Sequence, residues 1–326
     1  MRRKDNDEIL ARVRKMRGVR INTPEYFMIK RAFERLLQQR RIGNAAGDTG
    51  EAPGLAILGE SGSGKTTTFR RVRNEAEKTM NLQPNEVVSF TVQSPASIKG
   101  VGAAALDALG YPLRVNRTAF AIWQKVRDLL RENRTLILVV DEAQDIMRNQ
   151  SKREMQDVVS TLKTLMQIEG WPISVILLGV PHLPNAPGLL DLLHYDTQLA
   201  RRLRPIEFSP LSEATFKKDA SALISQYAAL AEVPTSSDLF DDKFVDRLIF
   251  SGHQQLGVTL ELVIEALEFA MRDGHELSRA HFREAYRDKT GAVDALNPFV
   301  TDDYRQVDPY KLLDSPEIPP TWEVPK

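Results

Sequence analysis

The sequence of 326 residues contains no cysteine, which excludes disulfide bonds and thiolate metal sites. It also lacks any apolar run approaching the ~18 residues that a membrane-spanning helix needs. The N-terminal segment MRRKDNDEILARVRKMRG has no apolar core of the kind that a secretory signal peptide requires. These three absences predict a cytoplasmic protein that does not act at a membrane.

A net charge is missing as well, because 44 basic residues balance 44 acidic ones. The charges are nevertheless unevenly distributed. Residues 1–20 hold eight basic and three acidic side chains, whereas residues 292–326 hold seven acidic and three basic ones. The basic segment predicts either contact with a polyanion or an acidic partner, or a solvated flexible arm. The overall charge therefore neither supports nor excludes binding to nucleic acid.

Composition and periodicity divide the chain into four parts. Residues 1–50 comprise the basic arm and an amphipathic helix over 24–41. Residues 51–210 alternate short apolar runs with helix-like segments, and residues 211–291 show four helical segments without strands. Residues 292–326 form an acidic tail, rich in proline, that we expect to be extended or disordered until a partner binds. Its apolar side chains, Phe299 among them, either anchor a partner or pack on the protein's own surface.

The apolar runs of the second part predict a parallel sheet. They are Leu55–Leu58, Val87–Val92, Leu136–Val140, Val175–Leu178 and, more weakly, Pro205–Phe208. Buried parallel strands separated by helices are typical of doubly wound sheets. The predicted fold class is therefore α/β, with a five-stranded parallel sheet followed by a small all-α domain.

The first apolar run leads into LGESGSGKTTT (58–68), which contains a phosphate-binding loop. The pattern G-x-x-x-x-G-K-[ST] is matched without a mismatch by Gly59, Glu60, Ser61, Gly62, Ser63, Gly64, Lys65 and Thr66. Backbone N–H groups of such a loop, and of the helix that continues through Thr67, surround phosphates. Lys65 is expected at the β- and γ-phosphates and the Thr66 hydroxyl at Mg²⁺. We therefore predict that ATP and Mg²⁺ bind here; the alternative is a Gly/Ser-rich turn.

The run LILVVDEAQD (136–145) supplies the second half of the predicted site. Its apolar residues form a strand, and Asp141 and Glu142 follow at the carboxyl edge, where open α/β sheets bind ligands. Asp141 is placed to hold Mg²⁺, and Glu142 to polarise the water that attacks the γ-phosphate. The alternative is that both carboxylates merely cap the next helix. Because kinases and GTPases built on the same loop lack this glutamate, Glu142 favours an ATPase.

An arginine from a neighbouring subunit usually completes such a site. The segment QLARRLRPIEF (198–208) offers Arg201, Arg202 and Arg204 just before the last strand. We select Arg202 as the candidate arginine finger. The alternative is a basic helix C-terminus that the helix dipole favours.

Five segments together resemble the TniB/TnsC family of AAA+ ATPases, which regulate DNA transposition. In chain order they are NTPEYFMIKRAFERLL, GESGSGKTTT, DEAQD, ILLGVPHLPN and DTQLARRLRPIEFSPL. The resemblance spans roughly residues 20–290 and implies an AAA+ fold with a helical lid domain. It also implies a homo-oligomer, a ring or a helical filament, on duplex DNA with ATP between subunits. The implied partners are a DDE-type transposase and a target-selection factor of the TniQ type, and hydrolysis drives disassembly.

Two departures from the AAA+ pattern concern its sensor residues. The run Val175–Leu178 is followed by Gly179-Val180-Pro181, so the polar side chain expected at the end of the fourth strand is missing. Ser174 lies at the other end of that strand, and His182 is the candidate substitute; the alternative is a surface histidine or one that is satisfied structurally. Residues 251–267 of the helical domain contain no arginine to serve as the second sensor. We therefore expect slow hydrolysis, which suits a switch.

The resemblance also places DNA contacts in the loop after the second strand, QSPASIKGVG (93–102). Ser97 and Lys99 are the candidate phosphate ligands there, and Gly100 and Gly102 let backbone N–H groups approach. A second candidate patch follows the DEAQD motif and consists of Arg148, Lys152 and Arg153. Such contacts hold a protein on DNA without reading its sequence. For each patch the alternative is a solvated helix face.

Two other functions stay open at this point. An AAA+ ATPase of the replication-initiator or secretion-associated kind would keep the chemistry and change the task. A nucleotide-bound scaffold that never hydrolyses ATP is favoured by the missing sensors, whereas the intact Lys65, Asp141 and Glu142 argue against it.

Overall fold

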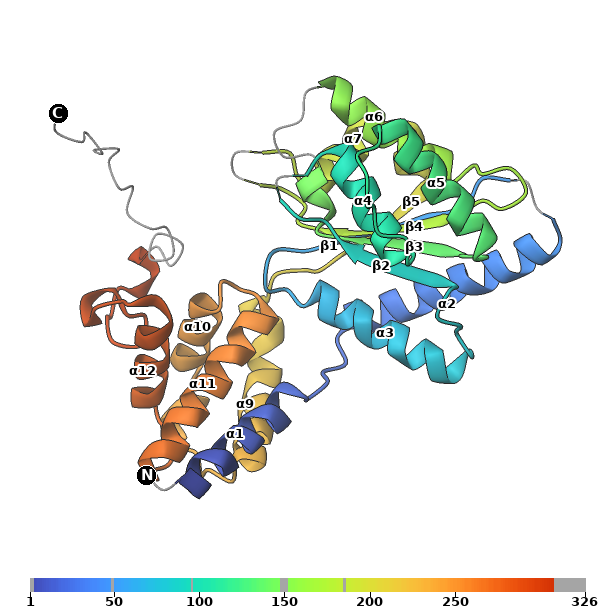
Figure 1. The fold of residues 1–326 in the computed structure, drawn as a ribbon. Coiled ribbons are helices and arrows are strands. Elements are labelled where there is room, and N and C mark those ends of the chain that lie inside the picture. The colour runs from blue at the N-terminus through green and yellow to red at the C-terminus, as the bar shows by residue number, and fades with distance from the viewer. Residues whose placement is uncertain (1–2, 48–49, 95, 147–151, 184–185, 308–326) are drawn as a thin grey trace, which may run out of the picture. The chain divides into compact units, whose positions relative to one another are not determined.

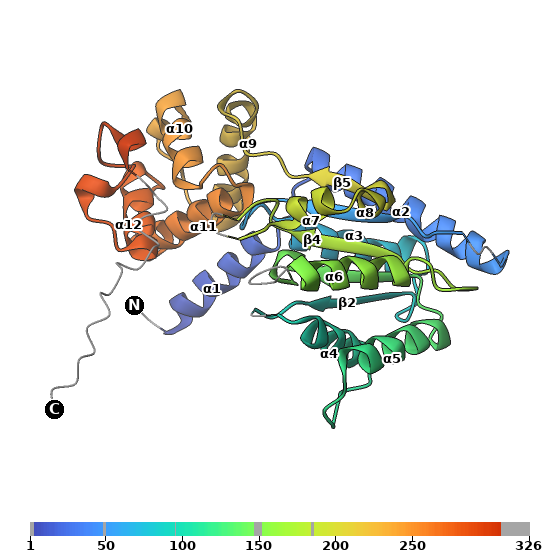
Figure 2. The same ribbon diagram turned by 90° about the horizontal axis from the view of Figure 1, so that it is seen from above.

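The structure is a computed structural model, and it describes residues 3–47, 50–94, 96–146, 152–183 and 186–307. The chain divides into two compact units, Asn22–Ser209 and a second unit formed by Met1–Ile21 with Pro210–Lys326. The first unit is a sheet covered by helices, and the second is a group of helices (Figures 1 and 2). Within the described ranges, no helix combines the length and the apolar character needed to cross a membrane.

The first unit is built on a sheet of five parallel strands. They are β1 (Gly54–Leu58), β2 (Val87–Thr91), β3 (Ile137–Asp141), β4 (Ser174–Gly179) and β5 (Leu203–Glu207), in the spatial order β2-β3-β4-β1-β5. β4 lies between β3 and β1, and its last residue, Gly179, is the register partner of Leu58. The sheet confirms the predicted α/β class.

Helices cover both faces of this sheet (Figure 1). α2 (Pro24–Ala45) and α3 (Lys65–Thr79) share an apolar cluster with Leu55 and Ile57 of β1. Ala56 and Leu58 point to the other face, which is covered by α4 (Ile98–Ala108), α5 (Ala119–Glu132), α6 (Lys152–Leu165), α7 (Leu189–Tyr195) and α8 (Thr197–Arg202). β1 is buried along its whole length because both faces are covered.

The second unit contains α1 (Arg3–Arg17), α9 (Glu213–Ala231), α10 (Asp242–Ser251), α11 (Leu256–Asp273) and α12 (Arg279–Thr290). Residues 1–50, which the sequence groups together, are thus divided between the units. α1 joins the second unit because Ile9, Val13 and Met16 recur at helical spacing and are buried among its apolar side chains. The N-terminal segment is therefore a packed helix from Arg3 to Arg17 and not a solvated arm.

Part of the acidic tail is folded as well, contrary to the expectation of an extended segment. Phe299 is buried, with its ring 5.5 Å from that of Phe282 between centroids. Arg247 donates hydrogen bonds to the carbonyl oxygens of Pro298 and Thr301. Residues up to 307 therefore pack on the protein's own surface, which is one of the two outcomes expected for Phe299. The rest of the tail, 308–326, lies outside the described residues.

α2 and α3 are joined by a polar cluster around Glu75. The Tyr26 hydroxyl donates to Glu75 Oε2 at 2.6 Å, Lys30 Nζ lies 3.0 Å from the same oxygen, and Arg71 Nε lies 2.9 Å from Oε1. These hydrogen bonds, that of Tyr26 foremost, lower the pKa of the Glu75 carboxyl from 4.5 to about 2. Because the folded-state pKa is depressed, the ionised carboxylate stabilises the fold above pH 4.5, and this stabilisation is lost as the pH falls toward 2.

We expect Tyr26→Phe to lower the free energy of unfolding by about 1–2 kcal/mol at pH 7, because it removes a hydrogen bond to a charged acceptor and keeps the ring. The difference from the wild type should shrink as the pH falls from 4.5 toward 2, where Glu75 becomes protonated in the folded protein as well. Urea unfolding at pH 7 and at steps down to pH 2 measures this. Tyr111→Phe is the control, because the Tyr111 side chain is exposed. An equal loss at every pH would contradict a role through the charge of Glu75.

Candidate nucleotide-binding site

The phosphate-binding loop leaves β1 at Leu58 and enters α3 at Lys65. Gly62 and Gly64 have φ angles of 79° and 91°, which side chains with a Cβ rarely adopt. Gly64 is the N-cap of α3, and it has no side chain that could accept a hydrogen bond from the first N–H groups of the helix. The loop therefore leaves backbone donors open at a helix N-terminus, which is the arrangement that binds phosphate.

Two polar side chains of the loop are buried without an ionic partner or without any partner. Lys65 is only 5% exposed, and its ammonium donates one long hydrogen bond, 3.5 Å, to the Glu60 carbonyl oxygen. No carboxylate forms an ion pair with it in the described part of the chain. The buried Ser63 Oγ has no hydrogen-bond partner there either. A buried cation beside an unsatisfied hydroxyl fits an anionic ligand such as a polyphosphate. Glu60, Ser61 and Thr67 are exposed around them.

The end of β3 meets the loop through one hydrogen bond. Thr66 Oγ1 donates to Asp141 Oδ1 at 3.1 Å, so the two predicted Mg²⁺ ligands are neighbours. Burial raises the pKa of the Asp141 carboxyl, although the hydrogen bond from Thr66 opposes this. A hydroxyl and one carboxylate, with phosphate oxygens to complete the shell, are the ligands that Mg²⁺ takes at nucleotide sites. The residues present therefore fit this ion.

Glu142 follows Asp141 in an uncommon backbone conformation. Its φ is 55°, in the left-handed region. Its N–H donates to Asp141 Oδ1 at 3.0 Å, and its carboxylate Oε2 accepts a 2.6 Å hydrogen bond from Gln144 Nε2. Gln144 lies in the 3₁₀ helix Ala143–Ile146 and is a site residue that the sequence reasoning missed. Its only sequence signal is its place in the DEAQD motif.

Arg202, the candidate finger, is already engaged within its own chain. Its side chain is 11% exposed and forms an ion pair with Glu51. Arg201 and Arg204 are exposed. Arg204 lines a cavity of about 160 Å³ with Phe27 and Arg31 of α2, among others. Arg202 must therefore leave Glu51 to reach a neighbour's nucleotide.

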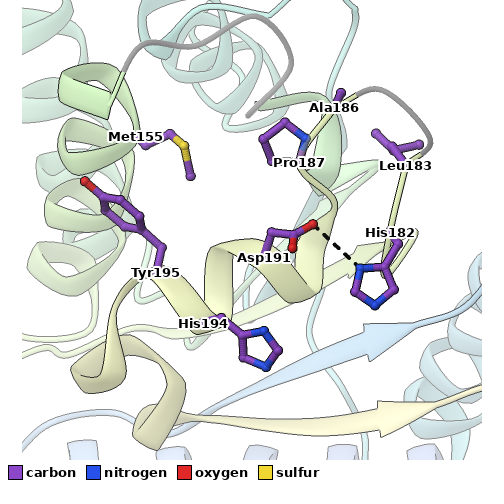
Figure 3. Close-up of a pocket in the computed structure, with 8 residues that line it drawn as sticks. All are labelled: Met155, His182, Leu183, Ala186, Pro187, Asp191, His194 and Tyr195. Carbon is purple, nitrogen blue, oxygen red and sulfur yellow. Dashed lines mark ion pairs between the residues drawn. The ribbon is translucent and has the colours of Figure 1, made fainter.

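His182, the candidate substitute for the missing polar sensor, faces an open pocket of about 680 Å³ beside α7 (Figure 3). Its Nδ1 lies 3.7 Å from Asp191 Oδ2, and the His182 side chain is largely exposed. His194 and Tyr195 line the same pocket. The polar atom that meets the end of β4 instead belongs to Gln144, whose Oε1 accepts from the Val180 N–H at 3.1 Å.

The first predicted DNA patch lies at the start of α4. Ser97 caps this helix by accepting from the Gly100 N–H, and Lys99 donates to Asn116 Oδ1 in the loop before α5. That loop adds two exposed cations, Arg114 and Arg117, which the sequence reasoning missed. The patch is thus more basic than predicted.

Gly102 does not serve close approach to DNA, because it is buried against α5 and a Cβ there would lie 2.6 Å from Ile122 Cγ2. In the second predicted patch, Arg153 is exposed on α6. Lys152 begins that helix and its side chain is not among the described ones. Arg148 lies outside the described residues.

Comparison with solved structures places the fold among AAA+ P-loop ATPases. The Aeropyrum pernix Orc1 protein in complex with DNA matches with a TM-score of 0.56 at 16% identity, over 82% of this chain and 66% of that one. Drosophila ORC bound to DNA matches with a TM-score of 0.53 at 15% identity, over 87% and 66%. The ADP form of the Aeropyrum pernix ORC2 protein gives 0.50 at 18%, over 81% and 70%.

The chain thus spans 66% of the Orc1 protein and of the Drosophila ORC chain. At these identities the likeness shows the fold alone, which is the predicted AAA+ fold with a helical region after the sheet. No curated protein sequence matches the chain.

One family model does match, and it covers residues 17–213, more than half of the 326 residues. Its description is "Bacterial TniB protein". The matched range contains the phosphate-binding loop, Asp141, Glu142 and the three candidate arginines. The family predicted from the sequence is therefore confirmed, and this chain belongs to the bacterial TniB family.

Proposed function

We propose that this chain is an ATP-dependent regulator of DNA transposition. It assembles on duplex DNA as a ring or helical filament, recruits or activates a DDE-type transposase, and disassembles after hydrolysing ATP. The observation that supports it most is the Thr66–Asp141 hydrogen bond, which brings the two halves of an ATPase site together in a chain of the TniB family. A target-selection factor of the TniQ type is its second partner, and the cytoplasm is its setting.

In this proposal each residue of the site has a separate task. The backbone of residues 59–64, Lys65 and Ser63 bind the phosphates, whose charge compensates the buried ammonium. Thr66 and Asp141 hold Mg²⁺, which when bound neutralises charge on the β- and γ-phosphate oxygens. Glu142 orients a water molecule and accepts its proton as that water attacks the γ-phosphate. The existence of an ADP form of a protein with this fold supports nucleotide binding by this chain.

ATP acts here as an assembly signal. Its γ-phosphate joins Lys65 of one subunit to Arg202 of the next, and Arg202 exchanges Glu51 for the phosphate as the subunits meet. Hydrolysis removes the bridging phosphate and returns Arg202 to Glu51. Assembly is therefore reversible and depends on the nucleotide.

The DNA surface is the basic patch at α4, formed by Ser97, Lys99, Arg114 and Arg117, with Arg148, Lys152 and Arg153 as a second patch. Cations on a surface hold DNA through its phosphates without a strong preference for sequence. Two proteins with this fold are known in DNA-bound form, which supports the assignment.

The first test is binding to random-sequence duplex DNA without nucleotide, with ATP and with a non-hydrolysable ATP analogue, in fluorescence anisotropy over a salt series. We expect the wild type to bind only with ATP or the analogue, and binding to weaken steeply with salt. Lys65→Ala should abolish this binding, whereas Glu142→Gln should prolong it because ATP stays intact. Lys78→Ala, an exposed lysine of the same helix, is the control. If the affinity for DNA were the same with and without nucleotide, a scaffold that only binds partners would explain the protein better.

The DNA patch is tested by reversing the charges of Lys99 and Arg117. We expect each substitution to glutamate to weaken DNA binding and to reduce the slope of log K against log salt by about 1 per lost phosphate contact. Binding of a fluorescent ATP analogue should be unchanged. Lys78→Glu on α3, on the other face of the sheet, is the matched control (Figure 1). An unchanged salt slope in both variants would show that DNA does not bind at this patch.

The arginine finger is tested by mixing variants. We expect Arg202→Ala to lower kcat by about 10³-fold or more, as removal of such fingers does. Lys65→Ala is inactive but keeps Arg202, so a mixture of the two variants should regain activity at shared interfaces. Glu51→Ala breaks the same ion pair and retains the arginine, so it should keep activity. A loss with Arg201→Ala or Arg204→Ala instead of Arg202→Ala would transfer the role to that residue.

A further inference from the structure

The end of β4 lies between the two halves of the proposed ATP site, because β4 pairs with β1 on one side and β3 on the other. β4 ends at Gly179, which has no side chain to offer there. The polar group at this place comes from another element. Gln144, after β3, is 3% exposed and extends its amide to the end of β4.

The orientation of the Gln144 amide follows from its two partners. A backbone N–H can only donate, so the amide oxygen faces the Val180 N–H, at 3.1 Å. The amide nitrogen then faces Glu142 Oε2, at 2.6 Å, and donates to it. One side chain thus joins the end of β4 to the glutamate proposed to activate water.

The same peptide group of β4 also contacts the phosphate-binding loop. The Val180 N–H and the Gly179 carbonyl belong to one peptide unit, and the Gly179 oxygen accepts from the Gly59 N–H at 3.1 Å. A continuous series of hydrogen bonds therefore runs from Gly59 through this peptide unit and Gln144 to Glu142. It links the backbone that surrounds the phosphates to the carboxylate.

Gly179 and Gln144 also depend on each other for space. A Cβ at Gly179 would lie 2.6 Å from Gln144 Oε1, closer than real Cβ contacts come. The glycine therefore leaves room for the glutamine amide. A polar side chain on β4 and a glutamine at 144 are alternatives for the same volume.

We infer that Gln144 is the positioning residue for Glu142, in place of the polar side chain that β4 lacks. It holds Oε2 of the carboxylate and leaves Oε1 for water. This inference rests on the proposed ATPase function. It assigns a role to the glutamine of the DEAQD motif, and it replaces His182 as the candidate for the missing sensor.

The test uses steady-state hydrolysis of ATP by the full chain, with kcat and KM determined separately. We expect Gln144→Ala to lower kcat roughly ten- to a hundredfold, because a misplaced catalytic group costs about that much, with KM for ATP nearly unchanged. Gln144→Glu keeps the shape and an acceptor for the Val180 N–H but cannot donate to Glu142. It should lose kcat as well, which separates positioning of Glu142 from support of the strand.

A second experiment places a polar side chain at the end of β4 and asks whether it can replace Gln144. Gly179→Asn alone should lower kcat, because its Cβ displaces the Gln144 amide. Combined with Gln144→Ala, which removes the nearest atom to that Cβ, the same asparagine can donate to Glu142 once Leu189 Cδ2 and the backbone nitrogen of residue 144, 3.2 and 3.3 Å from the Cβ, shift slightly. The double variant should therefore recover kcat relative to Gly179→Asn. Gln156→Ala, an exposed glutamine on α6, is the control for substitution of a glutamine.

Glu142→Gln in the same assay distinguishes failure of the inference from failure of the proposed function. If the wild type hydrolyses ATP and Glu142→Gln does not, the proposed activity stands. A wild-type or higher kcat in Gln144→Ala would then overturn the role of Gln144. If the wild type shows no hydrolysis, the proposed function itself is wrong.

Discussion

The proposed chemistry depends on the parallel pairing of β4 between β1 and β3. Parallel strands bring their carboxyl ends to one edge of the sheet, and neighbouring strands lie about 4.8 Å apart. The loop after β1 and the carboxylates after β3 are therefore separated by the width of one strand. Two connections cross this gap: the Thr66–Asp141 hydrogen bond, and the Gly179–Val180 peptide unit with Gln144. A shift of β4 by one residue would break the second, since Gly179 would leave its place opposite Leu58.

The backbone of Glu142 shows what this arrangement costs. A non-glycine residue in the left-handed region is strained by on the order of 1–3 kcal/mol. Glu142 keeps this conformation because its N–H bonds to Asp141 Oδ1, its carbonyl oxygen accepts from the Asp145 N–H, and its carboxylate accepts from Gln144. Three separate contacts therefore determine where the carboxylate lies. Strain held in this way is typical of functional sites, where the geometry of one side chain matters more than local stability.

The parts of the fold that sequence predicts well are those with a local signal. The phosphate-binding loop and DEAQD are contiguous motifs, and the apolar runs mark all five strands. Two contacts could not be predicted from the sequence: that of Gln144 with Val180 and that of Arg202 with Glu51. Each joins residues that only the strand order and the helices between strands bring together. α1 and Phe299 fall in the same class. Their charged or proline-rich surroundings indicate solvent, whereas burial against distant helices decides their structure.

The pairing of basic side chains with acidic ones bears on the proposed DNA binding. Basic residues of α1 pair with acids of their own unit, Arg12 with Glu232 and Arg17 with Glu261, so they contribute little to an external field. The cations at α4 differ, since none of them forms an ion pair with a carboxylate in the described part of the chain. In the proposed assembly, a few such cations per subunit would bind DNA weakly on their own. Joining subunits would raise their effective concentration along one duplex, so that the weak contacts add up. A modest patch on a neutral chain therefore suits the proposed dependence of DNA binding on ATP.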